Sequence, residues 1–261
     1  MTKVVVITGA SGGIGAALAG RLSRDRAQLV LAARRENELA AVAKDARATG
    51  AEKVLTVRAD VTNRSDVLAI KDRALEELGR IDVWVNNAGR GITRSVLDLT
   101  AEDVDEMIDV NVKSAIYGAQ AVVPHFIERG EGHLINISSF LGRVPIASFR
   151  SVYSASKAAL NSLTANLRMD LQQYPGIHVS LVMPGVVATD FARNVRGEVR
   201  PPMSAGGPGS SPMKPQTPEE VADKISELIA HPVAELYTNP ASAEIAKRYY
   251  ANQGEQDVST R

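Results

Sequence analysis

Tyr153 and Lys157 form the pair of side chains in this sequence best suited to acid–base chemistry. They are four residues apart in a stretch with helical periodicity, so they share one helix face. A phenol with a pKa of about 10 is a poor acid–base catalyst at neutral pH, but a nearby ammonium group favours the phenolate. Lowering that pKa to about 7 takes about 4 kcal/mol of differential stabilisation. Ser139 follows an apolar run, residues 134–137, and its hydroxyl can hydrogen-bond a substrate oxygen.

A glycine-rich turn near the start of the chain is typical of a phosphate site. Residues 4–7 form an apolar run and lead into Thr8-Gly9-Ala10-Ser11-Gly12-Gly13-Ile14-Gly15 and then a helical pattern. Glycines there allow a tight turn and close approach to a pyrophosphate at the helix N-terminus. The same letters fit the G-x-S-x-G elbow of serine hydrolases. Such an elbow normally follows several strands, and only His231 remains as a late base, so a hydrolase is disfavoured.

The residues after the second apolar run indicate which dinucleotide the turn binds. An NAD site places an acidic side chain about 20 residues beyond the turn, whereas this chain has Arg34 and Arg35 there. A guanidinium can bind a 2′-phosphate in a fork, and one such contact gives about 10- to 100-fold preference. We therefore expect NADP(H) to be preferred over NAD(H). The open alternative is that both arginines are solvated at a helix start.

Apolar runs alternate with amphipathic stretches along the chain. The runs are strands buried on both faces, at residues 4–7, 29–33, 54–59, 83–86, 134–137 and 179–183, with a short last strand at 234–238. The helical patterns lie at 14–24, 37–49, 65–78, 101–129 and 152–173. This alternation predicts an α/β protein: a single-domain, Rossmann-type, doubly wound parallel sheet of about seven strands with helices on both faces.

Composition excludes several classes of function. The 261 residues include 30 basic and 30 acidic side chains, so zero net charge gives no footprint for nucleic acid or an anionic membrane. The chain has no cysteine, and its four histidines lack the spacing of metal ligands. The first apolar run is too short for a signal peptide or a membrane span. We expect a cytoplasmic protein with no metal site.

The pattern changes after the sixth run. Residues 201–215 are rich in Pro, Gly and Ser, and we interpret 188–216 as a substrate lid loop on the ligand side of the sheet. Regular structure resumes at Thr217-Pro218-Glu219-Glu220, which has the form of a capped helix start. Residues 241–261 are expected to form a helical, then frayed, C-terminal tail. Residues 1–261 are expected to form one dinucleotide-binding and catalytic domain.

Taken together, the motifs resemble those of the classical short-chain dehydrogenase/reductase family, over roughly residues 3–240. They occur in the family's order and spacing: Thr8-Gly9-x-x-x-Gly13-x-Gly15, Asp60-Val61, Asn86-Asn87-Ala88-Gly89, Asn111, Ser138-Ser139, Tyr153-x-x-x-Lys157 and Pro184-Gly185-x-x-x-Thr189. The resemblance implies an NADP(H)-dependent oxidoreductase that moves hydride between the nicotinamide and a ketone, aldehyde or secondary alcohol.

The resemblance also implies roles for individual residues. Tyr153 is the proton donor, Lys157 lowers its pKa and binds the nicotinamide ribose, Ser139 polarises the substrate oxygen, and Asn111 holds a proton-relay water. The cofactor is expected to contact Gly9, Ser11, Gly13, Ile14, Gly15, Arg34, Arg35, Asp60, Val61, Asn87, Ala88, Gly89, Tyr153, Lys157, Pro184, Gly185, Val187 and Thr189. Phe140, Phe149 and Arg150 lie between Ser139 and Tyr153, where side chains can line a substrate pocket.

The chain departs from the family pattern in two places. Gly12 stands where NADP-preferring members often have a basic residue, so cofactor preference depends mainly on Arg34 and on Arg35. The chain end lacks the family's common Asp-Gly-Gly signature, which leaves dimer and tetramer both open, although association through 101–129 and 152–173 is the family expectation. The alternative function is a non-catalytic NADP(H)-binding sensor or scaffold, and the intact Ser–Tyr–Lys set argues against it.

Overall fold

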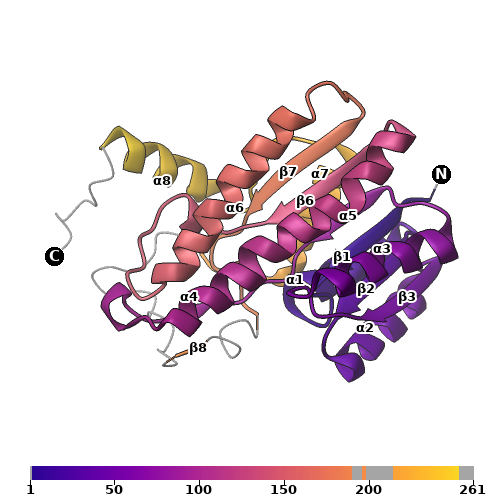
Figure 1. Cartoon of the computed structure of the whole chain (residues 1–261), viewed down its shortest axis with the longest axis horizontal. Helices are drawn as coiled ribbons and strands as arrows, with labels where there is room; N and C mark the ends of the chain where they lie inside the picture. The colour runs from indigo at the N-terminus through magenta and orange to yellow at the C-terminus, as the bar shows by residue number, and fades with distance from the viewer. Residues whose placement is uncertain (1, 190–195, 198–213, 253–261) are drawn as a thin grey trace.

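Seven parallel strands form one sheet in the order β3-β2-β1-β4-β6-β7-β9 (Figure 1). The computed structural model describes residues 2–189, 196–197 and 214–252. The strands are β1 (Val4–Thr8), β2 (Gln28–Ala33), β3 (Lys53–Arg58), β4 (Val83–Asn86), β6 (Gly132–Ile137), β7 (Ile177–Met183) and β9 (Glu235–Tyr237). All five residues of β1 are buried, as expected for a central strand covered on both faces. The predicted doubly wound α/β fold is confirmed.

Helices cover both faces of the sheet (Figure 1). One apolar core joins the sheet to α1, α2 and α7, and a second joins the opposite face to α3, α5 and the end of α6. The helices are α1 (Gly13–Arg24), α2 (Glu36–Thr49), α3 (Arg64–Leu78), α4 (Ala101–Ile108), α5 (Ser114–Arg129), α6 (Ser151–Asp170), α7 (Pro218–Ala230) and α8 (Pro240–Ala251). The expected capped start of α7 is present, because Thr217 and Glu220 cap one another.

The strand order reverses between β1 and β4. The chain runs outward from β1 through β2 to β3, then returns to β4 on the other side of β1. In open parallel sheets, ligands bind beyond the carboxyl ends of the strands at such a reversal. The turn after β1, the Asn87 segment after β4 and the serines after β6 therefore reach the same edge.

The helix expected over 101–129 is interrupted. A π-helical turn, η2 (Asp109–Lys113), separates α4 from α5. At this turn the Asn111 carboxamide binds the main chain of Arg90, 21 residues earlier, with both nitrogen-to-oxygen distances 2.9 Å. Helical turns of this kind are frequent at functional sites, and this one places Asn111 beside Arg90, which follows β4 at the carboxyl edge of the sheet.

Several short elements frame the carboxyl edge. Strand β5 (Ile92–Thr93) pairs with β8 (Arg196–Gly197), and neither was expected from the sequence. The 3₁₀ turns are η1 (Val96–Asp98) and η3 (Phe140–Gly142). The two ends of the interpreted lid, 188–216, are held together because Ala188 N donates to Gln216 O over 2.8 Å and Gln216 N to Val186 O over 2.9 Å. Lid residues 190–195 and 198–213 and tail residues 253–261 lie outside the described residues.

His133 lies within the core on β6 and is expected to make folding sensitive to acid. The Ser180 hydroxyl donates to Val233 O over 2.6 Å, so His133 Nε2 must donate to Ser180 Oγ over 2.8 Å. Its Nδ1 has no hydrogen-bond partner among the described residues. Burial, with the charges of His178 and Lys3, lowers the pKa of His133 to about 3.

Between pH 3 and 6.5, the unfolded chain therefore binds a proton that the folded chain does not. We expect the free energy of unfolding to fall as pH drops below 6.5, by up to about 1.4 kcal/mol per pH unit from this group. Urea unfolding at pH 7 and pH 5 measures this slope, which His133→Leu should reduce and which the exposed-site control His231→Gln should retain. An unchanged slope in His133→Leu would assign the acid sensitivity to other groups.

Candidate active site

Ser139, Tyr153 and Lys157 converge at the carboxyl edge of the sheet. Ser139 follows β6 and caps η3, accepting a hydrogen bond from Leu141 N over 3.2 Å. Tyr153 and Lys157 lie in the first two turns of α6, and both side chains are buried. A side-chain hydrogen bond joins Tyr153 to Ser139. Lys157 Nζ donates to Ile137 O over 2.9 Å and lies 5.9 Å from the centroid of the Tyr153 ring. The three predicted catalytic side chains thus form one cluster.

Burial dominates the electrostatics of the cluster. Burial raises the pKa of Tyr153 above its ordinary value, although the Ser139 hydrogen bond and the Arg150 charge both lower it. Burial also lowers the pKa of Lys157, to about 8. The Lys157 ammonium group donates to the Ile137 carbonyl, and its expected role in lowering the pKa of Tyr153 stays a prediction. The Arg150 charge therefore contributes to the pKa of Tyr153 beside the burial and the Ser139 hydrogen bond.

Asn111 lies beside this cluster and holds the polypeptide next to it. Besides its two bonds to Arg90, its Nδ2 donates to Ser156 Oγ over 3.1 Å. A Cβ built on Gly89 would lie 3.1 Å from Asn111 Oδ1 and 3.4 Å from Lys157 Nζ. Asn111 and Lys157 therefore flank the same glycine. The Asn111 carboxamide is hydrogen-bonded to the main chain of the next residue, Arg90. Its expected role in holding a relay water stays a prediction.

The glycine turn after β1 has the close backbone approach that its composition predicts. Gly9 has φ of +67°, and a Cβ there would lie 2.8 Å from Ala88 Cα. Asn87 Nδ2 donates to the carbonyls of Thr8 and Gly9 over 2.8 and 3.2 Å. The turn and the Asn87–Gly89 segment are thereby fixed to each other. Ile14 packs against the apolar core below the turn.

Two arginines flank the turn from the end of β2. The Arg35 guanidinium donates to Ser11 Oγ, with the shorter nitrogen-to-oxygen distance 3.0 Å, and it pairs with Glu38. Arg34 is 62% exposed and lies 3.7 Å from the Asp60 carboxylate. Burial would raise the pKa of Asp60, but hydrogen bonds from Thr62 and the Arg34 charge hold it below its ordinary value. The structure brings Arg35, rather than Arg34, onto Ser11.

The segment after β7 closes the other side of the turn. Phe140 N donates to Pro184 O over 2.8 Å, which ties this segment to η3, and Gly185 follows partly exposed. Val187 forms a bridge with Gln216. Thr189 packs close to Gly13, whose Cβ would lie 3.4 Å from its methyl group. A groove of about 800 Å³ runs from Gly13 and Thr189 between α1 and the start of α7. Val61, across the site, packs against the second core.

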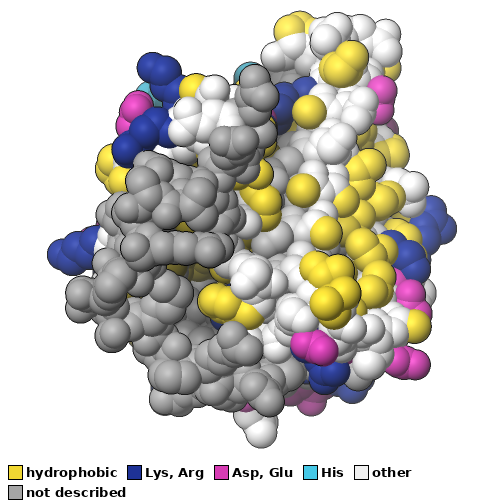
Figure 2. Space-filling view, turned by 90° about the vertical axis from the view of Figure 1, so that its left-hand side faces the viewer, with side chains coloured by type: hydrophobic (Ala, Val, Ile, Leu, Met, Phe, Trp, Pro, Cys, Tyr) yellow, Lys and Arg dark blue, Asp and Glu magenta, His cyan; other side chains and the backbone are white. Residues whose placement is uncertain are grey.

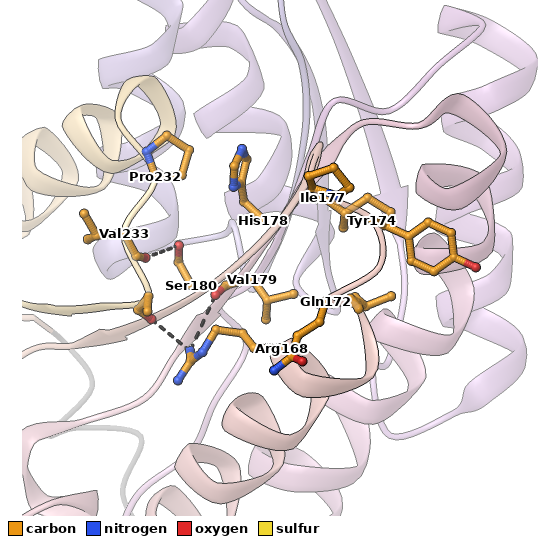
Figure 3. A pocket seen from close by; sticks show the side chains of 12 residues that line it. Arg168, Gln172, Tyr174, Ile177, His178, Val179, Ser180, Pro232 and Val233 are labelled. Atoms are coloured by element: carbon orange, nitrogen blue, oxygen red, sulfur yellow. Dashed lines mark hydrogen bonds between the residues drawn. The ribbon is translucent and has the colours of Figure 1, made fainter.

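A smaller pocket of about 260 Å³ lies away from this edge, at the amino-terminal end of β7 (Figure 3). Arg168 reaches across it to Val179 O and Ala234 O, over 3.5 and 2.9 Å. The Ser180 bond to Val233 closes the same strand edge (Figure 3). These polar groups are satisfied by the main chain, and the pocket shares no residue with the predicted site.

Sequence reasoning missed the roles of Arg90 and Ser156 in holding Asn111. No sequence signal identifies them, because their contacts depend on the π-helical turn. It placed Arg150 only as a residue between Ser139 and Tyr153, and the structure brings it within electrostatic reach of Tyr153. Among the described residues, no group of three or more acidic or histidine side chains is arranged to hold a metal ion. No described helix is long and apolar enough to cross a membrane.

Comparison with known proteins identifies the family. Residues 3–200 match the model of the short chain dehydrogenase family. This chain belongs to that family, a family of oxidoreductases, and the resemblance drawn from its motifs is confirmed.

Individual relatives agree with this assignment. An uncharacterized oxidoreductase of Staphylococcus saprophyticus is 38% identical over 190 residues, which is 73% of this chain and 80% of the relative. A short-chain dehydrogenase/reductase of Burkholderia phymatum, solved in complex with NAD, superposes with a TM-score of 0.84 at 31% identity, covering 97% of this chain and 96% of that one. A short-chain dehydrogenase of Sphingobium yanoikuyae, solved in complex with NADPH, superposes with a TM-score of 0.78 at 29% identity, covering 98% of this chain and 97% of that one.

Proposed function

We propose that this protein is an NADP(H)-dependent oxidoreductase that interconverts a ketone or aldehyde and the corresponding alcohol. The observation that carries the proposal is the convergence of Ser139, Tyr153 and Lys157 at the sheet edge that also carries the glycine turn. Two hydroxyl groups that hydrogen-bond to each other can both contact one carbonyl oxygen. The proposal is also supported by structural relatives solved with NAD and with NADPH.

The residues at the glycine turn fit a nicotinamide dinucleotide. Gly9 and Gly13 both have positive φ, the backbone conformation that a tight glycine turn at a phosphate requires. The α1 N-terminus begins at Gly13, which suits a pyrophosphate. Of the predicted contact residues, Asn87, Ala88 and Gly89 lie between this turn and Lys157. The dinucleotide would thus extend from the arginines after β2 toward the catalytic cluster.

In the proposed reaction, Tyr153 exchanges the proton on the substrate oxygen and Ser139 donates a hydrogen bond to that oxygen. The bound cofactor supplies or accepts the hydride at the carbon. Burial keeps Tyr153 protonated at neutral pH, which suits a proton donor for carbonyl reduction. The Lys157 ammonium lies under the same ring and stabilises the phenolate that forms when the proton leaves. Ser139 and Lys157 are both held by main-chain hydrogen bonds, which limits reorganisation.

We also propose that Ser11, Arg34 and Arg35 bind the 2′-phosphate of NADP(H). Arg34→Asp is expected to invert the preference, because a carboxylate repels the phosphate and accepts the ribose hydroxyls of NAD(H). Arg35→Met is expected to weaken NADPH binding by about 10- to 100-fold and leave NADH binding unchanged. Fluorescence titration with NADPH and NADH measures both ratios, with Arg73→Met on the exposed face of α3 as the matched control. Equal dissociation-constant ratios in all four proteins would place the phosphate site elsewhere.

The rival proposal is a sensor or scaffold that binds NADP(H) without turnover. Spectrophotometric assay of NADPH oxidation against a broad panel of carbonyl compounds separates the two. The reductase proposal predicts turnover on one chemical class. Tight NADPH binding with no turnover by any compound of the panel would favour the sensor.

The partners proposed for the protein are a small carbonyl or alcohol substrate and further copies of this chain. Exposed apolar side chains on the helices expected to associate support oligomer formation: Val104 on α4, Ile127 on α5, and Leu163 and Met169 on α6. Hydrophobic side chains also gather in a band on the face drawn in Figure 2. The mass of the protein in solution tests this proposal, and a monomer would contradict it.

A further inference from the structure

Three arginines lie around the mouth of the catalytic cluster, and two of them are neutralised. Arg90 forms an ion pair with Glu106. Arg94 lies 3.1 Å from the carboxylate of Asp103, which is fully buried. Arg150 has no carboxylate partner among the described residues. Of these three arginines, Arg150 is therefore the one whose charge no described carboxylate neutralises.

Arg150 is held in place by uncharged groups. Its Nη1 donates to Ile92 O over 3.2 Å, and its guanidinium lies 5.7 Å from the centroid of the Phe149 ring. Strand-like pairing of Arg94 with Arg150 fixes the main chain at the same point. The side chain is half-buried, and burial lowers the pKa of its guanidinium. Partial burial of this charge costs free energy, and an anion bound beside it would offset that cost.

The position of the Arg150 charge relative to the reacting groups indicates where such an anion would lie. Arg150 precedes Tyr153 by three residues, and each side chain shifts the pKa of the other. Tyr153 is in turn hydrogen-bonded to Ser139, and these two hydroxyls are the ones proposed to contact the substrate oxygen. An anion that neutralises Arg150 therefore lies close to the carbonyl being reduced.

We propose that Arg150 anchors a carboxylate on the substrate, so that the proposed reductase acts on oxo acids, or on hydroxy acids in reverse. This inference rests on the proposed function. A guanidinium suits a carboxylate because it donates two parallel hydrogen bonds. Among the described residues, Arg150 donates a hydrogen bond from Nη1 alone, so its other guanidinium nitrogens can bind the proposed carboxylate. Arg150 is then the specificity-determining residue of the site.

The test compares 2-oxo and 3-oxo carboxylates with their methyl esters as substrates for NADPH oxidation. The wild type is expected to prefer the acids by about 10- to 100-fold in kcat/KM. Arg150→Met should lose that factor for the acids alone, and Arg150→Lys should retain part of it. Arg73→Met, which removes a distant exposed charge, should behave as wild type. NADPH titration of each variant checks that the dinucleotide site is intact.

Two kinetic results would overturn the inference. One is equal turnover of acids and esters by the wild type. The other is an Arg150→Met variant in which kcat/KM for acids and esters falls by the same factor, which would mean that Arg150 acts only on Tyr153. A calorimetric titration of the NADP⁺-saturated protein with the oxo acids separates this inference from the proposed function. If no compound is turned over but the wild type binds the oxo acids and Arg150→Met does not, Arg150 is a carboxylate anchor and the proposed reductase activity is rejected. If the wild type does not bind the acids, or Arg150→Met binds them equally well, the carboxylate anchor is rejected too.

Discussion

Tyr153→Phe is expected to lower kcat by about 10²- to 10⁴-fold and to leave NADPH affinity nearly unchanged. The factor is what a positioned general acid contributes, because the variant removes one hydroxyl and keeps the ring that packs in the core. Val152, Met107 and Ile92 surround that ring, so the fold should be unaffected. Steady-state kinetics and NADPH titration of the purified variant measure the two quantities independently.

A matched control separates this effect from a general response to losing a phenol. Tyr174→Phe makes the same chemical change at the far pocket and is expected to retain wild-type kcat. Retained turnover in Tyr153→Phe would reject Tyr153 as the proton donor. Loss of NADPH binding in the same variant would mean that the hydroxyl holds the dinucleotide rather than the proton.

Lys157→Met is expected to lower kcat/KM by at least about 10²-fold at pH 7 and to make the protein more stable. The loss of activity follows from removing the ammonium that stabilises the Tyr153 phenolate. The gain in stability follows from burial, which lowers the pKa of Lys157 from 10.5 to about 8. That shift corresponds to a cost on the order of 3 kcal/mol at neutral pH. Losing the bond to Ile137 O offsets about 1 kcal/mol of the gain.

The sign of the pH dependence distinguishes this account from simple cavity filling. Between pH 8 and 10.5, the unfolded wild type binds a proton that the folded protein has lost, so wild-type stability rises with pH in that range. The stability advantage of Lys157→Met should therefore shrink from pH 7 to pH 10. Chemical unfolding at both pH values measures it, and a variant less stable than wild type at pH 7 would contradict a destabilising buried ammonium.

The fold could be predicted because its signals are local. Residues 4–7 are apolar throughout and 134–137 contain one polar residue, Asn136, and both runs are buried in strands of a parallel sheet. The break in 101–129 could not be predicted, because the π-helical turn depends on the contact of Asn111 with Arg90. Periodicity within a helix contains no information about a main-chain partner 21 residues away. The β5–β8 pair is too short to give a periodic signal.

The candidate site followed from spacing for Tyr153 and Lys157, which share a helix face whatever surrounds them. Side-chain direction was harder to predict. Arg34 and Arg35 are adjacent in sequence, and only the course of the chain after β2 decides that Arg35 reaches Ser11. The direction of the Tyr153 pKa shift also depends on burial, a property of the tertiary structure that the spacing of Tyr153 and Lys157 does not reveal.

The most direct test of hydride transfer uses NADPH that carries deuterium at both C4 positions. The protein is incubated with a carbonyl compound that it turns over, and the alcohol product is analysed by mass spectrometry. We expect one deuterium on the carbinol carbon for the wild type, and labelled alcohol formed about 10²- to 10⁴-fold more slowly by Tyr153→Phe. Alcohol formed without deuterium at that carbon, or labelled alcohol formed equally by both proteins, would contradict this expectation.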